Sequence, residues 1–187
     1  MNKRSHSQQY LDDFRKFGRF PAIHRDMADL VTGCTRARRF LDLACGTGLL
    51  GAQVVKRMGI ESFCLGVDSN VDYVSRGIGS GVPIQFHVAH VKRSSLTDLH
   101  ATLVMHRIDA VLARRCVPEL WGHDLEGGRS FPAMLHVAGV KEVYLEGRGP
   151  AGRLSNALPT VEHEIELFRG HFTPLVKLGR CAYLRRK

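Results

Sequence analysis

The chain has 187 residues, of which 44% are hydrophobic and 24% are charged. This composition predicts one globular domain whose core needs no disulfide or metal, and it argues against fibrous and disordered chains. No apolar run approaches the roughly 18 residues of a membrane span, so we expect no membrane partner. The formal net charge of +9 favours a nucleic acid or another anionic partner, although simple solubility is an equal alternative.

The five cysteines are dispersed, and none forms a Cys-x-x-Cys pair. The ten histidines are also scattered along the chain. We therefore expect no metal site. The first residues are basic, but no apolar run follows them, so we expect no signal peptide and a reducing, cytoplasmic location.

Two helices are expected before the first strand. Residues 7–17 carry apolar side chains at helical spacing, and Pro21 is well placed to begin a second helix that Gly33 ends. We expect residues 1–35 to form an N-terminal helical cap within the same domain as residues 36–187.

Strand-like apolar runs then alternate with helical patterns, as in a parallel sheet covered by helices. The expected strands are 40–44, 63–67, 83–88, 108–113 and 140–145. The expected helices are 49–58, 69–78, 95–105 and 129–137, after an irregular stretch around residues 127–128.

The C-terminal segment predicts one helix and a hairpin. Thr160 is expected to cap a helix with apolar residues at one face. Strands at 172–178 and 180–184 are separated by one glycine, which indicates a tight antiparallel hairpin, and Pro174 places its strand at a sheet edge. The expected fold is α/β: a single Rossmann-like, doubly wound sheet of seven strands, mostly parallel with a C-terminal antiparallel hairpin, preceded by N-terminal helices.

A glycine-rich turn follows the first strand, where residues 42–51 read DLACGTGLLG. Gly46 and Gly48 allow a tight turn and a close approach of a ligand to the backbone. Asp68 ends the second strand, where an acid can accept both hydroxyls of a ribose. The same spacing fits a dinucleotide site. Asp42 favours another ligand, because a carboxylate there repels phosphates and suits an amino group and a sulfonium; its alternative role is to bond the amides of the turn.

Residues 40–48 (FLDLACGTG) resemble the first motif of the class I S-adenosylmethionine-dependent methyltransferases, and residues 66–68 (GVD) resemble their second. The resemblance extends over residues 36–187 and implies S-adenosylmethionine as cofactor. The family usually has glycine where this chain has Ala44. The cofactor residues implied by the resemblance are Asp42 with the backbone of Ala44, Gly46 and Gly48 for the methionine part, Asp68 for the ribose, and Ser69 and Asn70 beside the adenine.

Two further segments differ from the family. An acid or amide commonly follows the third strand and binds the adenine amino group, whereas residues 89–91 read AHV here. The adenine contact is therefore assigned to His90 or to a backbone amide. Residues 114–120, which would line the reaction centre, read RRCVPEL. They match neither the Asn/Asp-Pro-Pro-aromatic run of base-amino methyltransferases nor the Pro-Cys nucleophile of cytosine-carbon enzymes.

Arg114, Glu119 and His123 are the catalytic candidates of this segment. Arginine suits a bidentate grip on carboxylate or phosphate. Since adjacent strand residues point opposite ways, only one of Arg114 and Arg115 is expected to face the pocket; a salt bridge to a helix acid is the alternative. Glu119 and His123 are candidate proton acceptors or, equally, solvated loop residues.

Three functions follow from these patterns. The leading one is a methyltransferase of undetermined substrate, with an anionic or nucleic-acid acceptor slightly favoured over a neutral small molecule. The second is a non-catalytic partner or regulatory protein that binds the cofactor, which the missing acid after the third strand leaves open. The third is an NAD-dependent oxidoreductase, against which Asp42 argues.

Overall fold

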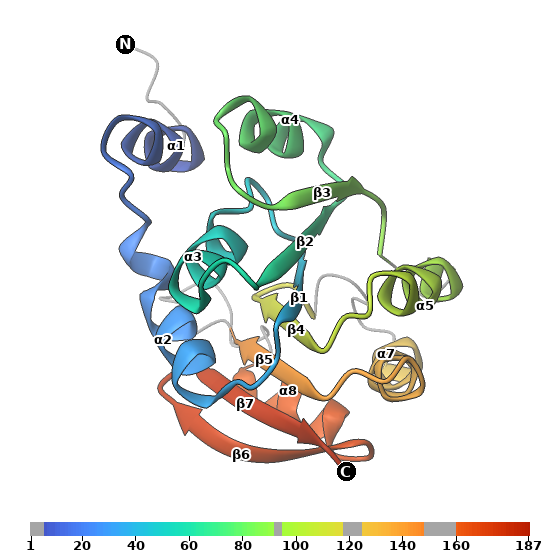
Figure 1. Ribbon diagram of the computed structural model, residues 1–187. Coiled ribbons are helices and arrows are strands. Elements are labelled where there is room, and N and C mark those ends of the chain that lie inside the picture. Colours follow the sequence, from blue (N-terminus) through green and yellow to red (C-terminus); the bar gives the residue numbers. More distant parts are fainter. Residues whose placement is uncertain (1–5, 92–94, 118–124, 148–159) are drawn as a thin grey trace, which may run out of the picture.

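The computed structural model of the protein describes residues 6–91, 95–117, 125–147 and 160–187 (Figure 1). The strands are β1 (Arg39–Leu43), β2 (Phe63–Asp68), β3 (Gln85–Val88), β4 (Ala110–Arg114), β5 (Glu142–Glu146), β6 (Phe172–Leu178) and β7 (Cys181–Arg186). The α-helices are α1 (His6–Phe17), α2 (Arg25–Cys34), α3 (Leu49–Met58), α4 (Val71–Gly79), α5 (Leu96–Met105), α7 (Leu125–Val137) and α8 (Val161–Phe168), and a 3₁₀ turn η1 (Ala22–His24) precedes α2.

The seven strands form one sheet in the order β3-β2-β1-β4-β5-β7-β6. Strands β1 to β5 are parallel to their neighbours. Strand β7 runs antiparallel between β5 and β6. The expected mostly parallel sheet with a terminal hairpin is therefore confirmed. Strand β6 lies at the edge, as its proline predicts, and the pairing with β7 is irregular between Pro174 and Val176.

Helices cover both faces of the sheet, as Figure 1 shows. On one face, buried residues of α5, α7 and α8 pack against β1, β4 and β5. On the other face, α2 and α3 pack against the same strands, and α1 adds Leu11 beside α3. None of the helices in the described ranges is long and apolar enough to cross a membrane. The outcome is a three-layer sandwich with the sheet between two layers of helices.

Two predicted helix boundaries are wrong. Gly33 lies inside α2, which continues to Cys34 and ends at an extended Thr35. Helix α7 begins at Leu125 rather than at residue 129, and it contains the glycines that predicted an irregular stretch. Gly128 is buried, and a Cβ built there would lie 3.5 Å from the Leu167 side chain of α8. Packing between the two helices thus outweighs the low helix propensity of glycine.

Two glycine-to-alanine substitutions separate helix propensity from packing. We expect Gly51→Ala in α3 to destabilise the fold by about 1–3 kcal/mol, because the new Cβ would lie 2.6 Å from the Cys64 sulfur. Gly33→Ala in α2 is the matched control, since a Cβ there meets no atom within 4 Å. It should stabilise the protein by about 0.5 kcal/mol through helix propensity. Urea unfolding measures both, and equal changes would contradict the close packing of α3 on the sheet.

Candidate active site

The strand order reverses between β1 and β4. From β1 the chain continues through α3 to β2, while β4 lies on the opposite side of β1 and continues through α7 to β5. In open α/β sheets, ligands bind outside the carboxyl ends of the strands at such a reversal. The candidate site is therefore built from the residues that follow β1, β2, β4 and β5.

Residues 44–48 form the turn between β1 and α3. Gly46 and Gly48 have φ values of 56° and 75°, the left-handed conformation that glycine adopts readily. At Gly48 a Cβ would lie 2.7 Å from the ring of Phe86, so a side chain has no room there. At Gly46 a Cβ would meet no atom within 4 Å. The glycine turn predicted from the sequence is present, and its backbone is open to a ligand at Gly46.

Non-glycine residues with positive φ begin the loops on both sides of the reversal. Ala44 follows β1 with φ 54°, and Arg115 follows β4 with φ 56°. This conformation costs a residue with a Cβ about 1 kcal/mol. Such strained residues concentrate at functional sites. A positive φ at position 44 explains why glycine is usual there in the family that the sequence resembles, because glycine adopts this φ without strain.

Asp42 is buried inside β1, with a side chain that is only 2% exposed. Its Oδ2 accepts the backbone N–H of Gly51 in α3 at 2.9 Å. Burial raises the pKa of Asp42 to about 7, against the opposing effects of the Gly51 hydrogen bond and the positive charge of Arg114. The alternative role given to this acid, bonding an amide near the turn, is thus present. A nearby cation would also stabilise its charged form.

Asp68 ends β2 beside the glycine turn. Its Oδ2 accepts the N–H of Gly46 at 2.7 Å, and its Oδ1 accepts the N–H of Asn70 at 2.8 Å. A carboxylate has about four acceptor positions, so each oxygen keeps capacity for a further donor. The acid therefore fixes the turn and can still accept two hydroxyl groups.

The other cofactor candidates lie at the same edge. Ser69 and Asn70 are exposed. The Asn70 side chain caps α4 by accepting the N–H groups of Asp72 and Tyr73. His90 is exposed beyond β3, and its carbonyl accepts the Ser95 hydroxyl at 2.6 Å.

Arg114 and Arg115 bind one carboxylate at the ends of β4 and β5. The Nε of Arg114 donates to Oε2 of Glu146, and the Nε of Arg115 donates to Oε1, each at 2.8 Å. Glu146 is 3% exposed. The expectation that the two arginines point opposite ways is wrong for these contacts, because Arg115 has left the extended conformation. The acid is on a strand and not on a helix. One carboxylate balances two guanidinium groups, which leaves the cluster positive.

His24 of η1 lies close to these arginines and was not identified from the sequence. Burial, followed by the positive charges of Arg114 and Arg115, lowers the pKa of His24 to about 3, so its ring is neutral at pH 7. Within the described ranges, Nδ1 of His24 and Nη2 of Arg114 are buried and have no hydrogen-bond partner. An imidazole acceptor and a guanidinium donor are groups that a polar ligand can bind.

The segment 114–120 also contains Cys116. Cys116 is buried and donates to the Leu43 carbonyl at 3.5 Å, and burial raises the pKa of its thiol well above the usual range. Glu119 and His123 lie outside the described residues. In the part of the chain that the structure describes, no three His, Cys, Asp or Glu side chains gather as metal ligands do.

Neither a protein-family model nor a curated protein sequence matches the chain. Solved structures match it over nearly its full length. An O-methyltransferase family protein from Burkholderia thailandensis has a TM-score of 0.62 at 17% identity, and the match covers 97% of this chain and 59% of that one. The chain thus spans less than two thirds of the length of the Burkholderia protein.

Two other structures match along both chains. The S-adenosylmethionine-dependent methyltransferase from Aquifex aeolicus has a TM-score of 0.60 at 12% identity, with 98% of each chain covered. A TehB-like S-adenosylmethionine-dependent methyltransferase from Corynebacterium glutamicum has a TM-score of 0.57 at 17% identity, with 97% of this chain and 98% of that one covered. The chain therefore has the class I, Rossmann-like methyltransferase fold.

The pKa of Asp42 predicts how stability depends on pH. A folded-state pKa of about 7, above the ordinary 3.8, means that the folded protein holds a proton that the unfolded chain loses. Stability should then fall as the pH rises from about 4 to about 7, and level off above that range. Asp42→Asn keeps an acceptor for Gly51 and should remove this part of the pH dependence.

Urea unfolding of both proteins at pH 5 and pH 8 measures the difference. The free energy of unfolding of the unmodified protein should decrease more between these pH values than that of the variant. The same decrease in both proteins would show that Asp42 does not carry a raised pKa.

Proposed function

We propose that the protein is an S-adenosylmethionine-dependent methyltransferase whose acceptor carries an anionic group. The observation that carries the proposal is the pair of acids, Asp42 and Asp68, on either side of an open glycine turn at the edge where this fold binds ligands. Two of the structures with this fold are described as S-adenosylmethionine-dependent.

The residues at this edge fit the cofactor. Asp68 keeps acceptor capacity on both oxygens, which suits a ribose diol. The open backbone at Gly46, together with Ala44 and Gly48, suits the methionine part. The exposed Ser69, Asn70 and His90 are proposed to lie beside the adenine.

Asp42 contributes charge rather than a direct contact in this proposal. Its carboxyl is buried and half protonated near pH 7. A ligand with an ammonium and a sulfonium group would lower the pKa of Asp42 and so favour the ionised carboxylate. A pyrophosphate would do the opposite, which disfavours NAD at the same edge.

Bound S-adenosylmethionine supplies an electrophilic methyl group. The protein then has to hold the acceptor in line with that group and keep water away. Arg114 and Arg115 are proposed to hold the anionic group of the acceptor, because the one carboxylate between them leaves a net positive charge. Glu119 and His123 are proposed to take the proton of a hydroxyl or amine acceptor.

Methyl transfer itself can be assayed with tritiated S-adenosylmethionine against separate pools of nucleic acid, protein and small metabolites. We expect label in an acceptor that binds to an anion-exchange resin. Label confined to neutral or cationic products would contradict the anionic acceptor. Tight cofactor binding without labelling of any pool would instead favour the non-catalytic regulatory protein.

Asp68→Ala should weaken S-adenosylhomocysteine binding by at least tenfold, because hydrogen bonds to a charged group contribute roughly 1.5–3 kcal/mol each. Isothermal titration calorimetry measures the affinity. Asp72→Ala is the matched control, since Asp72 is an exposed acid in the first turn of α4. Equal affinities for the two variants would show that Asp68 does not bind the ribose.

Arg114→Gln should lower turnover by about 10- to 100-fold and change the cofactor affinity less than threefold, since the arginine is proposed to hold the acceptor. Arg57→Gln is the control, because Arg57 pairs with Asp29 on the surface between α3 and α2. Thermal melting checks that both variants fold. Full activity of folded Arg114→Gln would remove Arg114 from the reaction centre.

A further inference from the structure

A second cluster of charge lies at the opposite edge of the sheet, where the parallel strands begin. A hollow of about 420 Å³ is lined by five cations and one acid: Arg36, Lys141, Arg185, Arg186, Lys187 and Glu142. Arg36 precedes β1, and Lys141 precedes β5. Because β7 is antiparallel to β5, with Arg185 opposite Glu142, the end of β7 meets the start of β5. The topology thus brings together cations from three distant parts of the chain.

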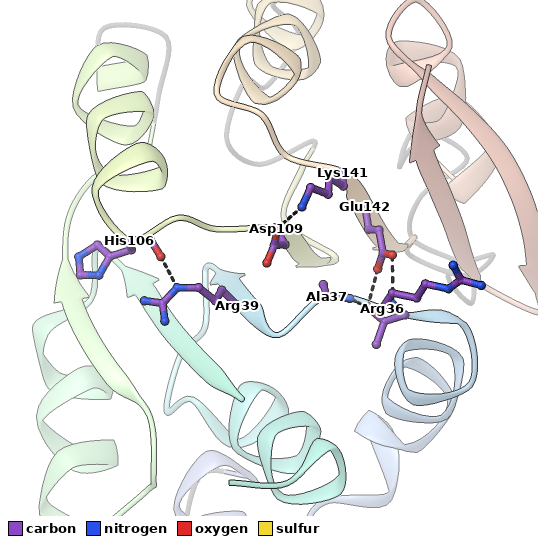
Figure 2. A network of polar contacts seen from close by, with 8 residues as sticks. Arg36, Ala37, Arg39, His106, Asp109, Lys141 and Glu142 are labelled. Carbon is purple, nitrogen blue, oxygen red and sulfur yellow. Dashed lines mark hydrogen bonds and ion pairs between the residues drawn. The ribbon is translucent and has the colours of Figure 1, made fainter. Parts of the chain in front are cut away.

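The one acid in this hollow offsets only part of the positive charge of the five cations that surround it. Glu142 is 5% exposed and accepts hydrogen bonds from the Thr35 hydroxyl, the Arg36 backbone N–H and the Tyr144 hydroxyl. All three are neutral donors. The Arg36 guanidinium points away from Glu142, as Figure 2 shows. Glu142 therefore fixes the start of β5 without an ion pair to the Arg36 guanidinium, and five cations against one acid leave the hollow with a surplus of positive charge.

Four of the cations are exposed and carry no ion pair within the described ranges: Arg36, Arg185, Arg186 and Lys187. Arg185 donates from Nε to the neutral Tyr183 hydroxyl at 3.0 Å. Lys141 differs, since its Nζ donates to Asp109 at 2.8 Å. Like charges held this close repel one another and weaken the fold, unless a partner of opposite charge binds them. The arrangement suits an anionic ligand.

The positive charge continues along the edge as a row. Arg39, at the start of β1, donates from Nε to the His106 carbonyl, and its guanidinium lies 4.3 Å from the centre of the Phe63 ring. Figure 2 shows Arg39, Lys141 and Arg36 along one edge of the sheet. From β1 to β7 there are three strand spacings, roughly 14 Å in all. A row of this length exceeds one phosphate group and matches several successive phosphates of a polynucleotide, which repeat about every 3.4 Å along a duplex strand.

We propose that this basic edge binds the phosphate backbone of a nucleic acid. No aromatic side chain is among the six residues that line the hollow, so the bases are not stacked there as on single-strand platforms. Binding is therefore independent of base sequence and is driven by counterion release. The site is separate from the carboxyl edge and does not depend on the proposed methyl transfer.

The test measures binding of a fluorescein-labelled 20-base-pair DNA duplex by anisotropy between 50 and 200 mM salt, without cofactor. The triple variant Arg36→Glu, Arg186→Glu, Lys187→Glu removes three phosphate contacts. The slope of log affinity against log salt should become shallower by about 2–3, and the affinity at 100 mM salt should fall at least tenfold. A triple variant with glutamine at the same three positions should also bind the duplex more weakly, with a smaller loss of affinity.

The control variant is Lys16→Glu, Arg76→Glu, Arg129→Glu, which makes the same change in net charge on the exposed surfaces of α1, α4 and α7. It should change the affinity less than threefold. An equal loss in the two triple glutamate variants would overturn the proposal, because net charge alone would then explain binding. Tighter binding to vesicles with 30% phosphatidylserine than to the duplex, or displacement of the duplex by micromolar pyrophosphate, would also overturn it. Circular-dichroism melting checks that every variant folds.

Discussion

The Asp42 carboxyl lies inside the joint between β1 and α3, and the geometry of the carboxyl edge depends on that joint. The acid accepts the amide of Gly51, and a side chain at Gly51 would meet the Cys64 sulfur at 2.6 Å. Helix α3 therefore sits very close to the sheet. The five residues between β1 and α3 must turn sharply, which requires left-handed backbone at Ala44, Gly46 and Gly48.

That turn in turn fixes the neighbouring acid. Asp68 accepts the N–H of Gly46, so the end of β2 is tied to the loop that follows β1. One hydrogen bond thus aligns the two segments that are proposed to hold the two halves of the cofactor. Burial raises the pKa of Asp42 to about 7, and a bound cation would favour its charged form.

The two edges of the sheet have different electrostatic character. At the carboxyl edge, Asp42 and Asp68 lie beside the glycine turn, and Glu146 pairs with Arg114 and Arg115, so this edge carries charges of both signs. At the amino edge the cations outnumber the acids, and the buried Glu142 is held by neutral donors. A cationic cofactor suits the first edge and a polyanion suits the second. Part of the net charge of +9 therefore lies at the amino edge, where a nucleic acid is proposed to bind.

Much of this architecture could be predicted from the sequence. The alternation of apolar runs and helical spacing predicts all seven strands. The position of the glycine turn and of Asp68 directly after predicted strands indicates that both lie at the carboxyl edge of the sheet. The arginine contacts could not be predicted, because they depend on a left-handed residue at Arg115 that pattern analysis does not detect. Glu146 could have been identified as a site residue from the sequence, since it is an acid that ends an apolar strand as Asp68 does. His24 could not, because the residues that it lies near are far away in sequence.

Every role proposed for the carboxyl edge requires that this edge binds a sulfonium cofactor. Isothermal titration calorimetry with S-adenosylmethionine, S-adenosylhomocysteine and NAD in parallel tests it most directly. Micromolar binding of the two sulfur compounds without binding of NAD is the predicted result. No binding of either sulfur compound by the folded protein would contradict the account and show that the fold is present without this cofactor.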